Sequence, residues 1–225
     1  MLAVVRALPN RNGSGAPSLD PLAPVDAEAE GLLARLATHD WTTELHCRRV
    51  ATWNERIATA MDRSPEEIAF AARCGLLHDI GKLFTPLSIL HKVGPLTSRQ
   101  QARMQDHVTD GAELLGSISV LEPYVDVVGA HHERFDGSGY PHSLAGEGIP
   151  LDARVVAVAD AFDAMISGRP YREAIRPVQA LEELHRFRGT HFDPAVVDTL
   201  IRILNGHIGR SRRTPDSSSA SPTDS

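Results

Sequence analysis

Seven residues of the types that commonly bind metals lie inside or at the ends of the apolar stretches of this chain. An unpaired polar group in an apolar interior costs several kcal/mol, so each of them needs a partner. The seven residues are His46, His78, Asp79, His107, His131, His132 and Asp160. A single metal cluster would satisfy all of them at once, and the sequence therefore predicts a fold built around such a centre.

Each of these residues also has an ordinary explanation when it is taken alone. A histidine on an apolar face, such as His46 or His107, is more often a hydrogen-bonded core residue than a ligand. Asp160 could be a buried salt-bridge partner, and the pair His78-Asp79 could be charges at the end of a helix. Seven such coincidences in one domain are much less probable than one cluster, which favours the metal centre.

The size and composition of the chain are typical of a small enzyme. The 225 residues suggest one domain with tails, and 42% hydrophobic residues suffice for one core. The formal net charge of −6 argues against a nucleic-acid polymer as partner. The two cysteines form no C-x-x-C motif, which argues against a disulfide framework and fits a reducing compartment, so we expect a cytoplasmic protein. No apolar run approaches the ~20 residues that would span a membrane.

Composition also suggests the limits of the folded domain. The N-terminal residues are rich in Pro, Gly, Ser and Asn, and residues 1–25 are predicted to form a disordered linker. The last residues are rich in Arg, Ser, Thr, Pro and Asp without periodicity, and residues 209–225 are predicted to form a disordered tail. The folded domain is expected over residues 26–208.

The domain is predicted to be all-α. Helices are expected over residues 65–82, 97–116, 152–167, 177–189 and 193–205, and capping residues such as Ser64, Thr97 and Asp152 mark their starts. A further helical stripe runs from His46 to Met61, with apolar residues at helical spacing. The chain shows no convincing strand periodicity and no internal repeat.

The candidate ligands come from the inward faces or the ends of different helices, as a metal site in a helical bundle requires. Imidazole and carboxylate ligands without thiolate suit iron, manganese, nickel or zinc. Seven ligands exceed what one tetrahedral ion needs, so we expect two ions with a bridging carboxylate, for which Asp79 is the best candidate. Two ions together can activate a water and hold a phosphate.

At this point the chain resembles a known family. The matching segments are H-x-x-R-V from His46, L-L-H-D-I-G-K from Leu76, H-x-x-x-G from His107, H-H-E-R-F-D-G-S-G-Y-P from His131, I-P-L-x-A-R from Ile149 and A-D-A-F-D-A-M-x-S-x-R-P-Y-R from Ala159. Together they resemble the HD-GYP domain of the HD phosphohydrolase superfamily, in the right order and spacing from about residue 40 to residue 192. A lone HD dipeptide would carry no weight, whereas this set is highly specific.

The resemblance implies a bacterial signalling enzyme that hydrolyses cyclic di-GMP to the linear dinucleotide or to GMP. It implies that the seven residues bind two divalent transition-metal ions, iron or manganese first, with nickel, cobalt or zinc as alternatives. It implies catalytic roles for Asp79 and Lys82, with Lys82 on the scissile phosphate. It further implies that the substrate is bound by Lys82, Gly139, Tyr140, Arg169 and Arg172.

Lys82, Arg169 and Arg172 could also have purely structural roles. Lys82 could be a solvated lysine at a helix C-terminus, and Arg169 and Arg172 could form salt bridges with acids such as Glu173. Three other functions also remain: a slow or inactive module that binds a cyclic dinucleotide or a signalling protein, an HD hydrolase for another nucleotide, and a di-iron oxygenase on the same scaffold. The complete ligand set argues against the first, and the G-Y-P loop with the R-P-Y-R segment favours a cyclic dinucleotide.

The chain departs from the family pattern at three places, one of which is the segment 83–87 (L-F-T-P-L), where the family usually has Ile-Pro-Asp or similar. Members with a third metal have a glutamate four residues before the first histidine, where this chain has Thr42, so we expect two ions. Pro95 stands where a lysine is common, which leaves Lys92 as the nearby base. Apart from Thr42, these departures bear on phosphate affinity and substrate preference rather than on the metal centre.

Overall fold

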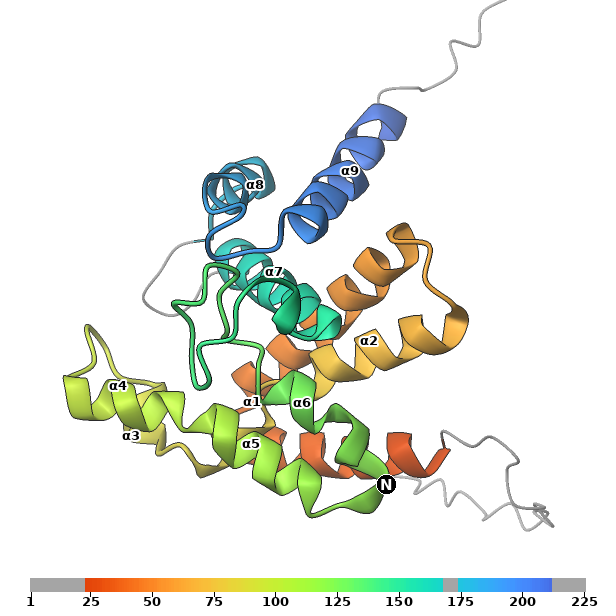
Figure 1. The fold of residues 1–225 in the computed structure, drawn as a ribbon. Coiled ribbons are helices and arrows are strands. Elements are labelled where there is room, and N and C mark those ends of the chain that lie inside the picture. The colour runs from red at the N-terminus through yellow and green to blue at the C-terminus, as the bar shows by residue number, and fades with distance from the viewer. Residues whose placement is uncertain (1–22, 168–173, 212–225) are drawn as a thin grey trace, which may run out of the picture.

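The computed structural model describes residues 23–167 and 174–211, with side chains through residue 205, and within these ranges the protein is helical with no strand (Figure 1). This confirms the predicted all-α class. The helices are α1 (Ala23–Ala60), α2 (Pro65–Leu77), α3 (Leu87–Leu90), α4 (Ser98–Gln105), α5 (His107–Gly116), α6 (Val125–Val128), α7 (Leu151–Ile166), α8 (Pro177–Arg186) and α9 (Pro194–Ser211). Short 3₁₀ helices span Ile80–Phe84 (η1), Ser119–Tyr124 (η2) and Gly146–Gly148 (η3). The predicted disordered ends lie almost wholly outside the described residues.

Helix α1 is broken at Asp40, whose backbone leaves the helical region with φ −151° and ψ 97°. The Asp40 side chain caps the second half, because its Oδ1 accepts hydrogen bonds from the Thr42 backbone N–H at 3.1 Å and from the Thr42 hydroxyl at 2.7 Å. The break lets the two halves of α1 pack against different parts of the core. It also begins a new helix five residues before His46.

Several helix starts agree with the prediction. Ser64 with Glu67 and Thr97 with Gln100 form complete capping boxes at α2 and α4. The Asp152 prediction was wrong, since this residue lies inside α7 and pairs with Arg63, with Oδ2 3.2 Å from Nη2. The Arg63 guanidinium satisfies the carboxylate, so it is not available to cap the helix.

The predicted helix ends need more correction. The helix expected over residues 65–82 ends at Leu77, and Lys82 lies in η1 after a turn that carries the HD pair. The helix expected over residues 97–116 is divided at Asp106, although this residue keeps helical angles and the break is slight. Helix α8 ends three residues before Gly189, and α9 continues to Ser211, beyond the predicted domain end at 208.

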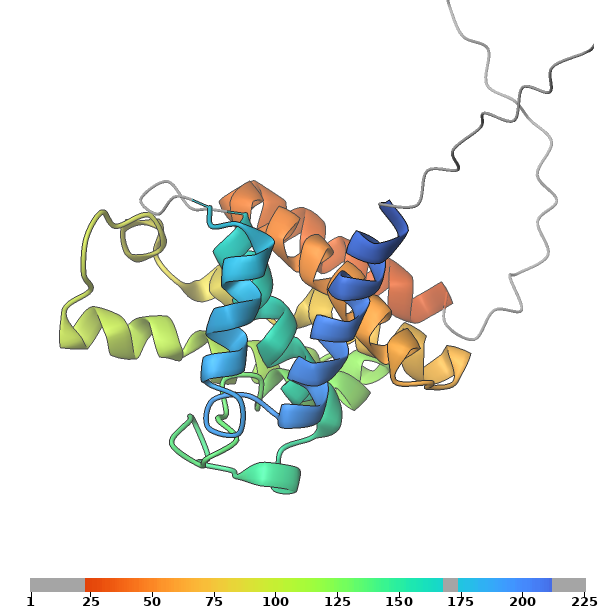
Figure 2. The ribbon, with the colours of Figure 1, turned by 90° about the horizontal axis from the view of Figure 1, so that it is seen from above.

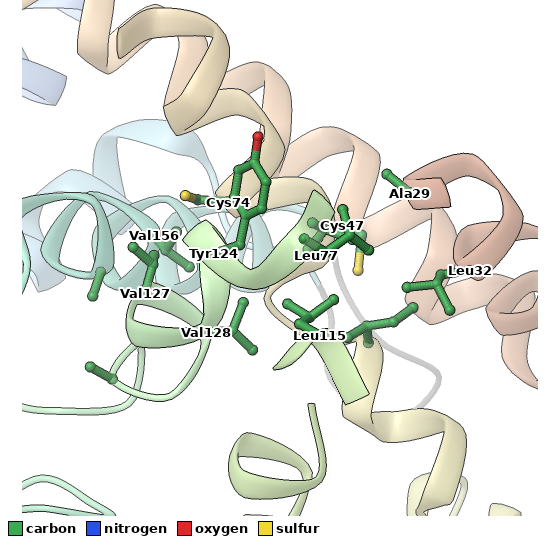
Figure 3. Packing of buried hydrophobic residues seen from close by; sticks show 14 of the residues in the cluster. Ala29, Leu32, Cys47, Cys74, Leu77, Leu115, Tyr124, Val127, Val128 and Val156 are labelled. Carbon is green, nitrogen blue, oxygen red and sulfur yellow. The ribbon is translucent and has the colours of Figure 1, made fainter. Parts of the chain in front are cut away.

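The helices enclose two hydrophobic clusters. Helix α1 packs along α2 and α7, α8 packs against α7, and α9 contacts both α1 and α7 (Figure 2). The first cluster joins the first half of α1 to α2, α5 and α6 and includes Leu32, Leu77 and Leu115 (Figure 3). The second joins the second half of α1 to α7, α8 and α9 and includes Ile57 and Phe162. The polar residues discussed below lie where the two clusters meet.

Candidate metal centre

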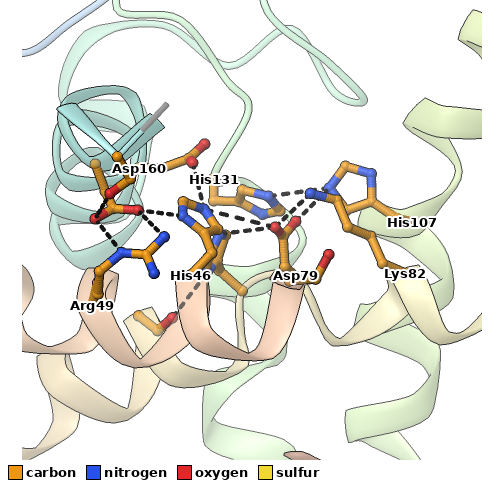
Figure 4. Close-up of polar contacts among 12 residues, drawn as sticks. His46, Arg49, Asp79, Lys82, His107, His131 and Asp160 are labelled. Atoms are coloured by element: carbon orange, nitrogen blue, oxygen red, sulfur yellow. Dashed lines mark hydrogen bonds and ion pairs between the residues drawn. The ribbon is translucent and has the colours of Figure 1, made fainter. Parts of the chain in front are cut away.

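The structure brings together all seven residues that the sequence singled out (Figure 4). They come from five places in the fold: His46 from α1, His78 and Asp79 from the turn after α2, His107 from the first position of α5, His131 and His132 from the turn after α6, and Asp160 from α7. His132 and Asp160 are half-buried and the other five are buried. A set of donors collected from so many elements cannot be a local helix-end charge pair.

The donors form two groups that could each hold a metal ion. One group consists of His46, His78 and Asp160, and the other of His107, His131 and His132. Within each group, one donor atom from every residue lies within 4.8 Å of the others. Each group thus offers three ligands of the imidazole or carboxylate type, which suits borderline divalent transition metals.

Asp79 lies between the two groups. Its Oδ1 is 3.3 Å from His107 Nε2, and its Oδ2 is 3.3 Å from His78 Nε2 and 3.9 Å from His46 Nε2. One carboxylate oxygen therefore faces each group. This is the position that a bridging carboxylate would occupy between two ions.

The backbone fixes the proton positions of three of the histidines. The Nδ1 atoms of His78, His107 and His131 lie 2.8, 2.6 and 2.7 Å from the carbonyl oxygens of the residues three positions earlier. Because a carbonyl only accepts hydrogen bonds, each Nδ1 carries a proton and each Nε2 faces the centre, and the neutral His107 and His131 present their Nε2 lone pairs to it. Such backbone partners are typical of histidines that bind a metal through Nε2.

The resulting lone pairs are oriented in a way that a cation would satisfy. His107 Nε2 and His131 Nε2 face each other at 3.4 Å, although neither has a proton to donate. His78 Nε2 lies 3.3 Å from Asp79 Oδ2; burial opposes the protonation of His78, but the charge of Asp79 outweighs it and raises the pKa of His78. Buried acceptors that face one another are unfavourable by themselves, so the donor set fits bound metal.

The charge states of three of the histidines also fit metal binding. Burial lowers the pKa of His107 to about 3 and that of His132 to about 4, and it lowers the pKa of His131 well below the usual value. These imidazoles are therefore neutral at pH 7, as metal ligands must be. Burial opposes the ionisation of Asp79, but the charges of Lys82 and His78 outweigh it and hold the pKa of Asp79 well below its usual range. Lys82 Nζ lies 2.5 Å from Asp79 Oδ2.

Two residues that support His46 were not anticipated from the sequence. Asp163 is buried, and its Oδ2 accepts a hydrogen bond from His46 Nδ1 at 2.7 Å. Arg49 donates to the same carboxylate through Nε at 2.8 Å and Nη2 at 3.0 Å. This leaves His46 Nε2 facing Asp160 Oδ1 at 2.9 Å. The sequence carried a signal for Asp163, because it follows Asp160 by three positions and also interrupts an apolar helix.

The loop after the histidine pair is held by Glu133, which the sequence analysis also passed over. Its buried carboxylate accepts from the backbone N–H groups of His142 at 2.6 Å and Leu144 at 3.1 Å. Gly139 packs so closely that a Cβ there would lie 2.3 Å from the Arg134 backbone nitrogen. Tyr140 stacks on His132, with ring centroids 5.1 Å apart. The loop thereby packs the Tyr140 ring against His132, one of the candidate metal ligands.

A cavity of about 1040 Å³ opens above the centre. Its lining includes His46, His107, His132, Asp160, Lys82 and Tyr140. Gly139 does not line the cavity and packs against the loop backbone, so its role in substrate binding stays a prediction. The roles of Arg169 and Arg172 also stay predictions, because both residues lie outside the described residues.

Two residues singled out by the departures from the family pattern have local partners. Lys92 Nζ donates a hydrogen bond to the Gln100 side chain at the start of α4, at 2.6 Å. Thr42 is occupied by its contacts with Asp40.

Fold and site together define a helical domain with a buried histidine and aspartate cluster under an open cavity. The family model described as "HD domain" matches residues 32–196, and the chain belongs to this family. The resemblance that the motifs indicated is thereby confirmed.

Several relatives carry related domains. The chain is 41% identical over 184 residues to the cyclic di-GMP phosphodiesterase response regulator RpfG of Xanthomonas campestris, covering 79% of this chain and 49% of that protein. It is 37% identical over 176 residues to 3'3'-cGAMP-specific phosphodiesterase 2 of Vibrio cholerae, covering 77% and 34%. The chain thus spans half or less of the length of these relatives.

Solved structures share the fold. An HDG"Y"P protein of Bdellovibrio bacteriovorus, Bd1817, aligns with a TM-score of 0.61 at 22% identity, covering 72% of this chain and 52% of that one. The HD domain of the L. monocytogenes phosphodiesterase PgpH in complex with cyclic-di-AMP aligns with a TM-score of 0.57 at 18% identity, covering 78% and 97%. In the described part of this chain, no helix combines the length and apolar character needed to cross a membrane.

Proposed function

We propose that this chain is a metal-dependent phosphodiesterase that hydrolyses a cyclic dinucleotide, with cyclic di-GMP as the first candidate. The observation that carries the proposal is the position of Asp79 between two three-residue donor groups, each facing one carboxylate oxygen. The names of the relatives support the choice of substrate, since those cited above act on cyclic di-GMP or 3'3'-cGAMP.

We propose two divalent transition-metal ions per chain, iron or manganese first. His46, His78 and Asp160 would hold one ion, His107, His131 and His132 the other, and Asp79 would bind both. The replacement of glutamate by Thr42 supports two ions rather than three, because the Thr42 hydroxyl carries no charge and is bonded to Asp40. When bound, such a pair activates a water and neutralises charge on a phosphate.

The residues of the chain supply the remaining parts of the reaction. The Lys82 ammonium lies beside Asp79 at the base of the cavity, where it can bind a phosphate oxygen and stabilise the charge that develops there. Tyr140 forms part of the cavity wall, and the proposal assigns it, with Arg169 and Arg172, to substrate binding. Burial, reinforced by the charges of Asp79 and Asp160, raises the pKa of Tyr140, so it stays a neutral phenol that can donate a hydrogen bond.

The test is metal analysis and a nucleotide panel on anaerobically purified protein. We expect two transition-metal ions per chain, and hydrolysis of cyclic di-GMP to the linear dinucleotide or GMP as seen by product chromatography. A reproducible count of one or three ions in fully loaded protein would contradict the two-ion centre. Binding of cyclic dinucleotides without turnover by fully loaded protein would instead favour a signalling module.

A further inference from the structure

The cavity has an apolar wall that the metal centre does not explain. Trp41 and Leu45 line it, and their exposed fractions are 64% and 42%, large values for such side chains. They lie four residues apart at the start of the second half of α1, so they share one face of that helix. Leu90 and Leu96 add further apolar side chains to the lining of the same cavity.

The hydrophobic clusters do not account for Trp41. The other tryptophan, Trp53, packs edge-to-face against Phe162 with ring centroids 4.9 Å apart, and it contacts the second cluster. Trp41 belongs to neither cluster and stays open to solvent. A large exposed aromatic ring beside a charged cavity is typical of a ligand-binding surface.

The position of the ring suits one particular ligand group. Trp41 precedes His46 by five residues, which corresponds to about 7–8 Å along the axis of the helix. Trp41 and His46 line the same cavity, so the apolar wall and the metal-binding floor face one shared space. The break at Asp40 and its hydrogen bonds to Thr42 and Thr43 hold the first turn of this half-helix in place.

We propose that the Trp41 indole, extended by Leu45, stacks on one purine of the cyclic dinucleotide while a phosphate lies over the centre. This rests on the proposed function and adds a base-binding residue to it. Stacking on an aromatic ring is tolerant of base identity, because every base presents a π-face. Trp41 therefore contributes affinity for both guanine and adenine dinucleotides and leaves the choice between them to other groups.

Fluorescence tests the contact directly. In a Trp53→Phe variant, Trp41 is the one remaining tryptophan. We expect the metal-loaded variant to show saturable quenching with the hydrolysis-resistant phosphorothioate analogues of cyclic di-GMP and cyclic di-AMP. A Trp41→Phe variant retains Trp53 as its reporter, and its emission should change little. Unchanged Trp41 emission when an analogue is shown by calorimetry to be bound would overturn the inference.

Steady-state kinetics measure how much Trp41 contributes to substrate binding. Loss of base stacking costs about 1–3 kcal/mol, so Trp41→Ala should raise KM for cyclic di-GMP by roughly five- to 150-fold and lower kcat less. Trp41→Phe should recover most of the affinity, and metal content should be unchanged. The control is Val178→Ala on α8, an exposed apolar residue that does not line the cavity, which should behave as wild type.

The two proposals can fail separately. If the wild type hydrolyses cyclic di-GMP and Trp41→Ala matches Val178→Ala, the stacking role is wrong and the proposed function stands. If fully loaded wild type neither binds nor hydrolyses any cyclic dinucleotide, both are wrong. If Trp41→Ala fails to fold, the fluorescence titration of the Trp53→Phe variant decides the question.

Discussion

Asp79 is the residue on which most of the proposed chemistry depends. Its two oxygens face different donor groups, and Lys82 is bonded to one of them. We expect Asp79→Ala to abolish hydrolysis and lower metal content, because a charged ligand to both ions is lost. Helix content by circular dichroism should be retained, which separates loss of the centre from unfolding. Wild-type turnover in a well-folded Asp79→Ala protein would refute the mechanism.

Asp163 is expected to act through His46 rather than on the substrate. Its carboxylate accepts from His46 Nδ1 and holds Arg49 by two hydrogen bonds. Replacing such a supporting carboxylate typically costs 10- to 100-fold in metal affinity or activity. We expect Asp163→Asn to lower metal affinity by about that factor, measured by competition with a chelator, with added metal restoring part of the activity.

The matched control for Asp163→Asn is Asp198→Asn, which alters an exposed pair with Arg188. Surface pairs of this kind contribute about 0–1 kcal/mol, so the control should retain metal and activity. If the two variants bound metal equally well, Asp163 would have a purely structural role beside Arg49.

At the level of helices, the turn carrying the HD pair is fixed by close contact with α5. A Cβ on Gly81 would lie 1.9 Å from the His107 carbonyl oxygen and 2.5 Å from the Gly111 backbone nitrogen. Since both neighbours are backbone atoms, neither can move without displacing the helix. The separation of Asp79 from His107 therefore depends on a residue without a side chain.

We expect Gly81→Ala to destabilise the fold by about 1–3 kcal/mol or more and to reduce metal binding. Gly31→Ala is the control, since a Cβ there meets nothing within 4 Å and the residue is exposed on α1. Alanine at such a helical position should stabilise the protein by roughly 0.5–1 kcal/mol. Urea unfolding of both variants measures the contrast, and equal stabilities would show that α5 shifts easily.

The helices illustrate what periodicity can and cannot predict. Capping residues located the starts of α2 and α4, because a cap is a local hydrogen-bond pattern visible in the sequence. The end of α2 at Leu77 was missed, since the chain turns there to meet α5, a contact distant in sequence. The break at Asp40 was missed for a related reason: helical spacing continues on both sides of it.

The candidate metal ligands were easier to find in the sequence than the residues that support them. Histidines in apolar segments are conspicuous, and all seven candidates lie in one centre. Asp163 and Glu133 were passed over, because a buried carboxylate can pair with any of many cations or N–H groups. Only the structure shows their partners. Asp163 pairs with Arg49, and Glu133 accepts from the backbone N–H groups of His142 and Leu144.

For the whole molecule, the centre connects the two hydrophobic clusters. Asp160 lies between Ala159 and Ala161 of the second cluster, whereas Asp79 and His131 adjoin residues of the first. Metal that binds the folded chain and not the unfolded chain should therefore stabilise both halves together. A ligand present at 100 times its Kd raises the free energy of unfolding by about 2.7 kcal/mol.

We expect removal of metal by a chelator to lower Tm by roughly 5–10 °C for each ion lost, since 1 kcal/mol shifts Tm by about 2–4 °C in a domain of this size. Differential scanning calorimetry with and without added manganese measures the shift. The Asp79→Ala protein should show a much smaller difference. Identical Tm values for protein with and without bound metal, verified by elemental analysis, would contradict this coupling.

The contact between Gly81 and Gly111 has a consequence for how such a centre can be altered by design or selection. Where side chains separate two helices, a change in side-chain size changes the distance between them. Two glycines in backbone contact allow only one distance. Side chains that orient a candidate ligand, such as Asp163 and Arg49 behind His46, are better positions for changing the proposed metal preference. Libraries aimed at a new metal should leave both glycines intact and vary these supports.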